Sequence, residues 1–332
     1  MFDVVSLGEL LVDFTYHGKS ENGMRLFEQN PGGAPANVLC ALANLGLKTS
    51  FIGKIGDDMH GNFLCSVLEE KGVDTSRVIS ANDVFTTLAF VELSESGERQ
   101  FSFARKPGAD TQLTPEEIKN IKWDDCKIFH FCSISITDEP VRSATISAIH
   151  AAKKAGCIIS YDINYRAPLW QSEWDAREQI RNLLHLVDII KISDEEMFLI
   201  TDSTSPEAAA EYLLDLGIPC VVVTLGSGGA FAATKSANVL VPVPDVPVID
   251  TTGAGDAFWS GFLYKLIEKG RKPNQLQKTE LTQFTAFANA VAALCVQKRG
   301  GIPAMPKIEE VNEFVQTYSS QYGVASNNNR QL

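Results

Sequence analysis

The chain has 332 residues, of which 45% are hydrophobic and 21% are charged, and its formal net charge is −12 at pH 7. This length can bury a full core, either as one large α/β domain with an appendage or as two modest domains. The acidic balance argues against binding to nucleic acid, because neutralising phosphates requires clustered Lys and Arg, which the sequence lacks.

In chain order, the first third alternates between strand and helix and is then interrupted by a hairpin. Apolar runs and turn signals predict strands at residues 3–7, 10–16 and 50–55, and helices from the turn at 31–37 through Leu45 and from a cap at Asp57 to about Lys71. Residues 86–93 and 99–104 then alternate as two strands joined by the polar turn at 94–98. A hairpin inside a βα alternation predicts a small separate sheet, such as a lid.

The rest of the chain returns to alternating strands and helices. Strands are predicted near 127–133, 157–162, 187–192, 220–225, 229–234 and 238–249. Helices are predicted from a capping box at 114–117 and near 138–155, 173–185, 205–217, 280–297 and 307–319. Near-continuous apolar strands between helices indicate a parallel sheet covered on both faces, whose ligands sit beyond the carboxyl ends of the strands. The tail from Ser320 is polar and Asn-rich, so we expect it to be frayed.

The stretch around which the other polar clusters are organised is residues 250–258, which read Asp-Thr-Thr-Gly-Ala-Gly-Asp-Ala-Phe. The apolar run before it, 246–249, predicts the end of a buried strand, and apolar residues at helical spacing predict a helix after it, ending at Gly270. At such a turn the backbone N–H groups and the helix dipole converge on an anion. Asp256 would lie beside that anion, where a carboxylate can accept the proton of a hydroxyl that attacks a phosphate.

A bare Gly-Ala-Gly-Asp string can also be an ordinary turn capped by Asp250 and Asp256. Two other phosphate-binding motifs are excluded by the residues present. No Lys-Ser/Thr follows the glycines, as a P-loop requires, and the G-x-G-x-x-G dinucleotide fingerprint is absent. The choice between a plain turn and an anion site therefore depends on the motifs elsewhere in the chain.

A second glycine-rich stretch decides that choice. Residues 32–37 read Gly-Gly-Ala-Pro-Ala-Asn, and the pattern continues to Gly56. Together with residues 250–258, in this order and about this far apart, it resembles the ribokinase-like (PfkB) carbohydrate kinases, and within them the fructokinases. The resemblance covers nearly the whole chain, from Gly8 to Pro306.

The resemblance implies a ribokinase-like three-layer α/β sandwich with a mostly parallel central sheet, plus a small β-sheet lid. A single kinase domain would span residues 1–319, with lid strands from about 11–29 and 85–105, and residues 320–332 would be a disordered tail. The implied activity is direct, in-line transfer of the γ-phosphoryl group of ATP to a sugar hydroxyl, without a covalent enzyme intermediate.

The resemblance also implies a role for each polar cluster at the positions that match the family pattern. Asp256 would be the general base, the backbone of Gly253, Ala254 and Gly255 would bind the transferring phosphoryl group, and Arg166 would counter its charge. Sugar contacts would come from Asp13, Gly32, Gly33, Asn37, Phe103, Arg105, Asp162 and Asn164, with Asp256. Two alternatives stay open, Asp13 as a strand-end cap and Arg105 as a surface arginine.

Asp162, Asn164 and Arg166 end a predicted strand in a D-x-N-x-R pattern, and strand alternation would place all three side chains on one face. Contacts with the nucleotide are implied for Lys191, Ser193, Thr224, Gly226, Gly229, Gly253, Gly255 and Asn289.

Metal ions are implied at two places. Ser193-x-x-Glu196 is a helix capping box in its own right. The family has Asn where this chain has Ser193, so Glu196 alone is kept, as an indirect Mg²⁺ ligand. Asp250 and Thr252, with the loop at 299–301, resemble a monovalent-cation site. The implied cofactors are therefore ATP and Mg²⁺, with K⁺ as a further candidate.

Fructose is the first choice of sugar, because residues 129–135 and 300–303 also look like fructokinase segments. The alternatives are 2-keto-3-deoxygluconate and ribose. The acidic sugar would need extra donors for its carboxylate, whereas the lid offers Phe101 and Phe103; Glu9 and the extended lid argue against ribose. A non-catalytic sugar or nucleotide sensor on the same fold would be indicated by loss of Asp256 or of the glycine turn, and both are present.

The expected partners are small molecules, the sugar and ATP, with no nucleic acid and no membrane. The exposed edges of a lid sheet could pair in a homodimer. Seven cysteines, odd in number and without a C-x-x-C pair, indicate reduced thiols in the cytoplasm rather than disulfides or a zinc site. No signal peptide is recognisable at the start of the chain, and no apolar run is long enough to span a bilayer.

Overall fold

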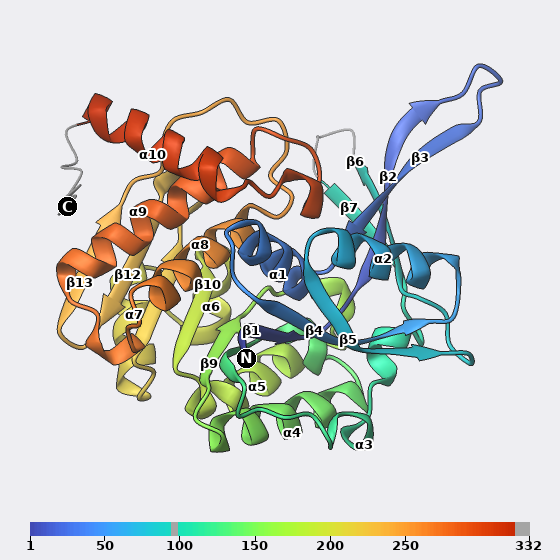
Figure 1. Cartoon of the computed structure of the whole chain (residues 1–332), viewed down its shortest axis with the longest axis horizontal. Helices are drawn as coiled ribbons and strands as arrows, with labels where there is room; N and C mark the ends of the chain where they lie inside the picture. Colours follow the sequence, from blue (N-terminus) through green and yellow to red (C-terminus); the bar gives the residue numbers. More distant parts are fainter. Residues whose placement is uncertain (94–98, 323–332) are drawn as a thin grey trace.

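A large sheet of nine strands lies at the centre of the molecule in the computed structural model, which describes residues 1–93 and 99–322 (Figure 1). Its strands are β1 (Phe2–Leu7), β4 (Thr49–Gly56), β5 (Val73–Ala81), β8 (Cys126–Cys132), β9 (Ile158–Asp162), β10 (Ile189–Ser193), β11 (Cys220–Thr224), β12 (Ala230–Thr234) and β13 (Ala237–Val241). They are ordered β13-β12-β11-β10-β9-β8-β1-β4-β5. All neighbours from β5 to β11 pair in parallel, and β12 and β13 add two antiparallel strands at one edge.

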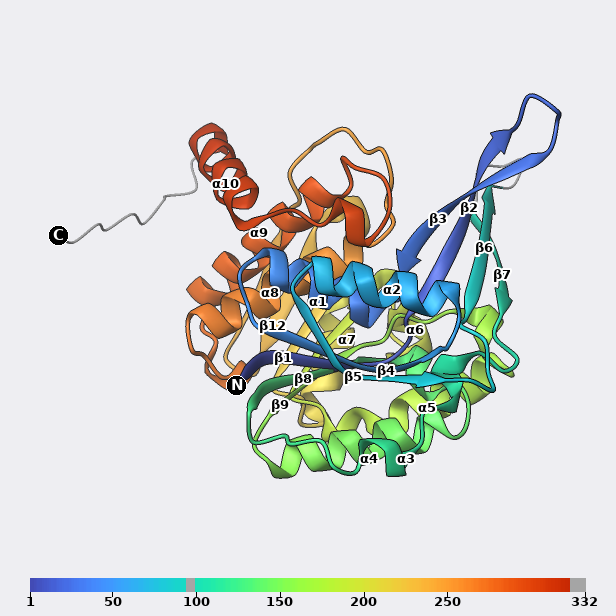
Figure 2. The same cartoon turned by 45° about the vertical axis from the view of Figure 1, so that its right-hand side comes forward.

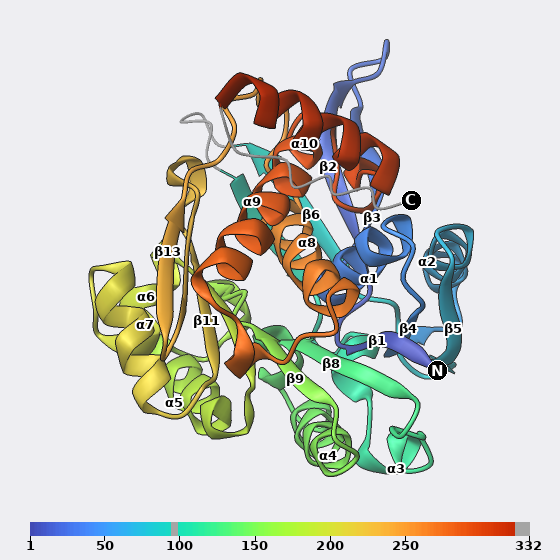
Figure 3. The ribbon, with the colours of Figure 1, turned by 60° about the vertical axis from the view of Figure 1, so that its left-hand side comes forward.

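Helices cover both faces of this sheet, as the near-continuous apolar strands predict. One face carries α3 (Pro115–Ile118), α4 (Val141–Lys154), α5 (Glu173–Leu183), α6 (Asp194–Thr201) and α7 (Pro206–Asp215). The other carries α1 (Ala34–Asn44), α2 (Met59–Glu70), α8 (Ala254–Glu268) and α9 (Lys278–Cys295), and α10 (Ile308–Tyr322) packs outside α9. Figure 3 shows the sheet between α6 and α7 on one side and α8 and α9 on the other. The three layers are those expected from the sequence.

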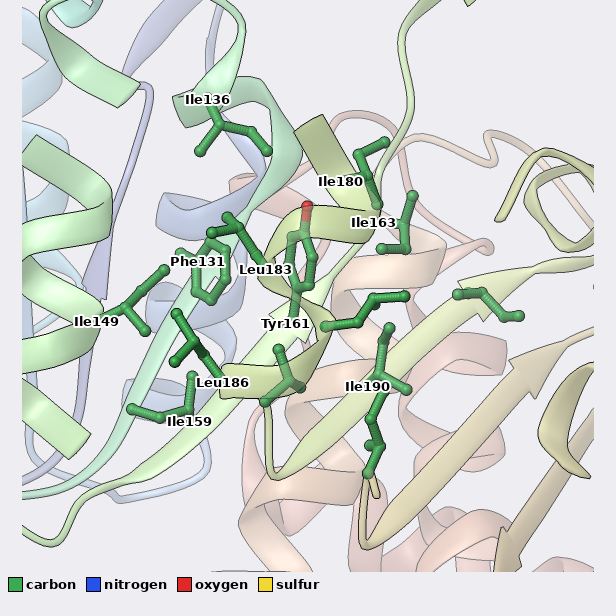
Figure 4. Close-up of a cluster of buried hydrophobic side chains, with 14 of the residues drawn as sticks. Phe131, Ile136, Ile149, Ile159, Tyr161, Ile163, Ile180, Leu183, Leu186 and Ile190 are labelled. Carbon is green, nitrogen blue, oxygen red and sulfur yellow. The ribbon is translucent and has the colours of Figure 1, made fainter. Parts of the chain in front are cut away.

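The core beneath α4 and α5 is built from aromatic and branched side chains. Phe131 and Tyr161 stack on neighbouring strands with their ring centroids 4.3 Å apart. Ile149 of α4 and Ile180 of α5 close over them, as Figure 4 shows. Burying this apolar surface fixes β8 and β9 against each other. The carboxyl ends of both strands are therefore held in place for the polar residues that follow.

A second sheet projects from the body as a lid (Figures 1 and 2). It consists of β2 (Leu11–Lys19), β3 (Arg25–Gly32), β6 (Leu88–Leu93) and β7 (Arg99–Ala104), in the order β3-β2-β6-β7. β2 and β6 pair in parallel, and the two outer pairings are antiparallel. The separate lid sheet is confirmed, and β3 runs to Gly32, beyond the expected limit at residue 29. The turn predicted at 94–98 lies outside the described residues.

Two local predictions are wrong for physical reasons. The cap of α2 is Asp58, whose Oδ1 accepts the N–H groups of His60 and Gly61 at 2.9 Å, whereas the amide of Asp57 still pairs with β5. No strand precedes the 250–258 stretch: β13 ends at Val241, and Val248 and Ile249 are 62% and 60% exposed. Prolines at 242, 244 and 247 remove N–H donors, so this segment cannot continue a ladder.

The C-terminal end differs in part from its expectation. Helix α10 continues to Tyr322, so residues 320–322 are helical rather than frayed. The remainder of the expected tail, 323–332, lies outside the described residues. Within the part of the chain that the structure describes, no helix has the length and apolar character needed to cross a membrane.

Candidate active site

The start of α8 forms an open cradle of backbone amides. Gly253 precedes the helix with φ 75°, a left-handed conformation that suits glycine, and a Cβ there would lie 3.1 Å from Gly301 Cα. The amide of Ala254 donates to the carbonyl of Thr251 at 3.2 Å. Among residues 1–93 and 99–322, the amides of Gly253, Gly255 and Asp256 have no hydrogen-bond acceptor. These open amides and the positive end of the helix dipole make an anion site.

Asp256 lies in the first turn of α8, beside this cradle, and is paired with Asn37 of α1. The Nδ2 of Asn37 donates to Oδ2 of Asp256 at 2.7 Å. Burial and the neighbouring Asp162 carboxylate raise the pKa of Asp256 to about 7, against the lowering effects of Asn37, Lys191 and Arg166. A carboxylate with a pKa close to neutral pH is well matched to accepting a proton from a hydroxyl.

The glycines at 32 and 33 bring the lid and α1 together. Gly33 has φ 116°, and a Cβ on it would lie 2.3 Å from the carbonyl oxygen of Glu9. A Cβ on Gly32 would lie 2.3 Å from Oδ2 of Asp13, so the Asp13 carboxylate rests directly on the glycine. Glycine is required at position 33, where the neighbour is backbone, whereas at position 32 any side chain would displace the Asp13 carboxylate. Asp13 is thereby held next to the helix that carries Asn37.

Register places Phe103 with Asp13 on the lid. Asp13 of β2 pairs with Ala89 of β6, and Ala89 pairs with Phe103 of β7. Residues paired across a sheet point to the same face. Phe103 therefore shares the face of Asp13, although it does not line the cavity described below.

Asp162 and Lys191 form a buried ion pair at the ends of β9 and β10. The Nζ of Lys191 donates to Oδ1 of Asp162 at 2.6 Å, and both side chains are almost fully buried. Although burial alone would lower the pKa of Lys191, the carboxylates of Asp162 and Glu196 raise it on balance. A Cβ built on Gly255 would lie 3.5 Å from the same Nζ. The ammonium group therefore lies next to the amide cradle.

The expected placement of Asp162, Asn164 and Arg166 by strand alternation is wrong, because β9 ends at Asp162. Asn164 has φ 43°, in the left-handed region, and Arg166 precedes a short 3-10 turn. Both nevertheless line the cavity in front of α8. Arg166 is exposed, and its Nη1 donates to the carbonyl of Tyr165 at 3.0 Å.

Ser193 and Glu196 form the capping box of α6. Oγ of Ser193 accepts the amide of Glu196 at 3.3 Å, and Oε2 of Glu196 accepts the amide of Ser193 at 2.7 Å. The other carboxylate oxygen accepts the amide of Tyr165 at 2.7 Å. Glu196 therefore also holds the loop that carries Arg166.

Carboxylates near this cavity suit a magnesium ion that is held partly by its substrate. Mg²⁺ in such sites is bound through one or two carboxylates, water and phosphates. Asp194, Glu195 and Glu196 line the cavity and supply carboxylates of this kind. The described residues contain no group of three or more His, Cys, Asp or Glu that could hold a metal by themselves. The donor set therefore fits an ion shared with a phosphate.

A cavity of about 380 Å³ extends from the cradle along the ends of β10 and β11. It brings together the residues expected to contact a nucleotide, which are Lys191, Ser193, Thr224, Gly226, Gly229, Gly253, Gly255 and Asn289. The Nδ2 of Asn289 is fixed by the carbonyls of Val241 and Pro242, at 3.0 and 3.1 Å. Gly229 has φ 92°, and a Cβ there would lie 2.1 Å from the Val241 carbonyl oxygen.

Asp250 ties two loops together behind the cradle. Its Oδ1 accepts both the amide and the hydroxyl of Thr252, at 2.9 and 2.7 Å, and its Oδ2 accepts the amide of Gly300 at 3.0 Å. The structure therefore brings Asp250 and Thr252 to the loop at 299–301. Carboxylate and carbonyl oxygens at this junction are ligands of the type that K⁺ takes.

Arg105 lies apart from the cavity, at the base of the lid, and is buried rather than on the surface. Its Nε donates to Oδ2 of Asp110 at 2.7 Å, and Nη2 donates to the carbonyl of Ile134 at 3.1 Å. Nη1 donates to Thr137 Oγ1 at 2.8 Å and to Asp138 Oδ2 at 3.2 Å. The guanidinium is thus engaged mainly by protein groups.

Glu9 and Asp110 are buried acids at this end of the molecule that were not singled out as site residues from the sequence. Oε1 of Glu9 accepts the amide of Ala34 at 2.7 Å, and burial raises the pKa of Glu9 to about 7. For Glu9, the signal available in the sequence was an acidic residue inside an apolar run, two positions after the strand at 3–7. Its partner 25 residues away could not be read from that run.

Comparisons with known proteins agree with this geometry. Residues 1–308 match the family described as pfkB family carbohydrate kinase. A rice (Oryza sativa subsp. japonica) protein named fructokinase-2 is 40% identical over 316 residues, covering 94% of this chain and 93% of the rice chain.

Two solved structures have the same fold. The fructokinase of Xylella fastidiosa with bound ATP has a TM-score of 0.88 and 34% identity, over 96% of this chain and 100% of that one. The fructokinase of Vibrio cholerae O395 in its fructose, ADP and calcium ion bound form has a TM-score of 0.84 and 33% identity, over 94% of this chain and 99% of that one.

Proposed function

Because the chain belongs to the pfkB family of carbohydrate kinases, and is therefore a sugar kinase that takes its phosphate from ATP, we propose that its sugar is D-fructose and its product fructose 6-phosphate. The observation that carries this proposal is the match of almost the whole chain, lid included, to fructokinases, one of which holds fructose and ADP. The site geometry supports the chemistry, because a carboxylate, open amides and cations meet at the start of α8.

Asp256 acts as the general base in this proposal. Its carboxylate takes the proton of the attacking sugar hydroxyl, and the oxygen attacks the γ-phosphoryl group in line with the departing ADP. The hydrogen bond from Asn37 orients the carboxylate and leaves its other oxygen to face the hydroxyl. The sugar is held at the lid end of the site by Asp13, Gly32, Gly33 and Asn37, with Phe103, Arg105, Asp162 and Asn164 as the further expected contacts.

The open amides of Gly253 and Gly255 stabilise the transferring group, because negative charge develops there. The amide of Ala254, which was expected to share this role, donates to the carbonyl of Thr251 instead. Lys191 lies next to the cradle and Arg166 opens onto the same cavity. Both are cations that can offset the charge of the phosphates. Ser193, Thr224, Gly226, Gly229 and Asn289 would hold the rest of the nucleotide.

The metal ions fit this proposal at the two places described above. Glu196, with its neighbours in α6, would hold Mg²⁺ through water, and the ion would neutralise the phosphate oxygens. Asp250, Thr252 and the loop at 299–301 would hold K⁺, which would order the segment leading into Gly253. Activity measured with K⁺ and with tetramethylammonium at equal ionic strength tests the second site. Equal rates in the two salts would remove K⁺ from the proposal.

Neither the acidic sugar nor the non-catalytic sensor gains support. A 2-keto-3-deoxygluconate kinase needs cations for a sugar carboxylate, and Arg105 is already engaged by Asp110 and Asp138. A non-catalytic sensor would not need a paired carboxylate with a pKa of about 7 beside open amides.

Rates with ATP and Mg²⁺ should therefore be compared for fructose, ribose, 2-keto-3-deoxygluconate, glucose and adenosine. We expect fructose to have the highest kcat/KM and phosphorus NMR to show the 6-phosphate. A higher kcat/KM for the acidic sugar would overturn the choice of fructose and leave the base assignment intact. Absence of turnover on all five would favour the sensor.

A homodimer through the lid fits the exposed surface of that sheet. β3 and β7 are its edges, and Met24 and Leu26 of the lid hairpin are exposed apolar residues. A second copy of this chain would cover them. Sedimentation of the protein and of Leu26→Glu measures this: we expect a dimer that the variant weakens, and a monomer at all concentrations would exclude it.

A cytoplasmic location is supported by the thiols. All seven cysteines are free, which suits a reducing compartment. Fractionation of the source cells would test this, and recovery with an organelle or outside the cell would contradict it.

A further inference from the structure

The lid joins the body through four chain crossings that lie side by side. β2 begins at Leu11 and β3 ends at Gly32, and these two residues are paired. β6 begins at Leu88 and β7 ends at Ala104, and these two are also paired. The pairing of Val12 with Leu88 puts the two pairs in adjacent rows of the sheet. Whatever holds these crossings sets the position of the lid over the site.

Asp110 holds both crossings of the β6–β7 half. It lies in a 3-10 turn (Ala109–Gln112) and is 3% exposed. Its Oδ1 accepts the hydroxyl of Thr87, the residue before β6. Its Oδ2 accepts Nε of Arg105, the residue after β7, at 2.7 Å. One buried carboxylate therefore joins the two chain segments by which this half of the lid enters and leaves the body.

Arg105 continues this anchor to the carboxyl end of β8. Its Nη2 and Nη1 donate to the Ile134 carbonyl and the Thr137 hydroxyl, and both partners follow β8. The charge of a buried carboxylate is costly unless a cation and hydrogen bonds compensate it. Arg105 supplies that compensation. Asp110 and Arg105 therefore stabilise each other only while the end of β7 stays in place next to the 3-10 turn.

Glu9 does the same for the β2–β3 half. It lies between β1 and β2 and is 2% exposed. Its Oε1 accepts the amide of Ala34, two residues beyond the end of β3, at 2.7 Å. Its Oε2 accepts the thiol of Cys132, the last residue of β8, at 3.3 Å. Each half of the lid is thus fixed by one buried carboxylate, and both reach the same end of β8.

We propose that Asp110 is a positioning residue which, through Thr87 and Arg105, fixes the β6–β7 half of the lid over the sugar, as Glu9 fixes the β2–β3 half. The inference rests on the proposed sugar kinase activity for its consequence and on the contacts that Asp110 makes with Thr87 and Arg105 for its geometry. A lid that is held in place over the site excludes water from the γ-phosphoryl group when sugar binds. A loosened lid should bind sugar less well and allow water to compete with the sugar hydroxyl.

The test compares Asp110→Asn with Asp138→Asn. Asp138 also contacts Arg105, at 3.2 Å, but its side chain is 50% exposed, so it is a matched control for loss of one carboxylate. In Asp110→Asn we expect the KM for sugar to rise about 10-fold, with the KM for ATP within about 2-fold. We also expect a larger fraction of the ADP to form without sugar phosphate. Asp138→Asn should resemble the parent in all three quantities.

Thr87→Val gives a second variant that leaves the Asp110–Arg105 pair intact. It replaces the Thr87 hydroxyl with a methyl group of similar volume. It can therefore replace Asp110→Asn in the test if that variant does not fold. We expect the same pattern with smaller changes. Equal rises of the KM for sugar and for ATP, or Asp110→Asn behaving as Asp138→Asn, would overturn the positioning role.

Hydrogen exchange of the free protein separates this inference from the proposed function. We expect peptides from β6 and β7 to exchange at least about 10-fold faster in Asp110→Asn, with peptides from α8 and α9 unchanged. Uniformly faster exchange would mean that Asp110 serves stability in general and would also overturn the role. If the lid alone loosens but no sugar is phosphorylated, the anchor stands and the proposed function fails.

Discussion

Two helices in this molecule begin in almost the same way but differ in how their first backbone amides are used. α1 and α8 each follow a glycine in the left-handed region, Gly33 at φ 116° and Gly253 at φ 75°. At α1 the first amide donates a hydrogen bond to the Glu9 carboxylate, and the next position is Pro35, which has no N–H. At α8 the amides of Gly255 and Asp256 are left open within the described chain. The Glu9 carboxylate at the start of α1 anchors the fold, whereas the two adjacent open amides at the start of α8 are available to a phosphate.

The acids at these two helix starts sharpen the comparison. Burial raises the pKa of both Glu9 and Asp256 to about 7. Both oxygens of Glu9 accept protein hydrogen bonds, whereas Asp256 accepts one, from Asn37. A raised pKa therefore does not identify a base without a free oxygen that faces the substrate. The predictions below test this difference, from the largest expected effect to the smallest.

Asp256→Asn should lower kcat by roughly 10³-fold or more, because it removes the group that takes the hydroxyl proton. Sugar affinity should stay within about 3-fold, because the amide keeps the volume and one acceptor. Single-turnover rates and sugar titration by calorimetry measure the two quantities. Turnover close to that of the parent would remove Asp256 as the base.

Gly253→Ala should lower kcat by roughly 10²-fold, because a side chain in the left-handed region is strained and would lie 3.1 Å from Gly301 Cα. Gly270→Ala is the matched control. Gly270 follows the other end of the same helix with φ 58°, and a Cβ there meets no atom within 4 Å. It should lose stability without a comparable loss of kcat. Equal losses of kcat would show that strain alone, and not the cradle, is being measured.

The acid limb of kcat/KM should have an apparent pKa of about 7, since protonated Asp256 cannot accept a proton. The rate should therefore fall about tenfold per pH unit below that value. Asn37→Ala removes a hydrogen bond that lowers this pKa, so its acid limb should move to higher pH. An unchanged limb in Asn37→Ala would contradict the coupling between these two side chains.

Glu9→Gln should have the smallest effect on kcat, within about 3-fold, because Glu9 holds α1 and takes no proton from the substrate. The folded-state pKa of Glu9 lies above its ordinary value of 4.5, so this group withdraws stability as pH rises from 4.5 to 7. The variant should therefore flatten the decline in unfolding free energy over that window. Urea unfolding at several pH values measures this. A loss of kcat as large as that of Asp256→Asn would erase the distinction between the two acids.

The sequence was informative where a local pattern determines a local structure. Apolar strands between helices predicted the covered parallel sheet, and the glycines at 253 and 255 with Asp256 predicted a helix start beside an anion site. The strand expected at 246–249 was wrong because three prolines between 242 and 247 outweigh an apolar run. Ser193 and Glu196 form the expected capping box, since all of its atoms come from four consecutive residues.

Contacts between distant residues could not be read in this way. The partners of Arg105, which are Ile134, Thr137 and Asp138, come from a strand end about 30 positions later and could not be predicted from the residues around it. Nothing in the residues beside Glu9 indicates that its acceptor oxygen meets Ala34. Such pairings depend on how the lid and the sheet are arranged, and this information is spread over the whole chain.

The hydrogen bond between Asn37 and Asp256 joins positions 219 residues apart, and this has a consequence for the protein's synthesis. At ribosomal speeds of about 5–20 residues per second, Asn37 waits roughly 10 to 40 s before its partner is made. During that time α1 can already pack on β1 and β4, but neither Asp256 nor the amide cradle beside it exists. A nascent chain thus stays unable to transfer phosphate until most of its length has left the ribosome.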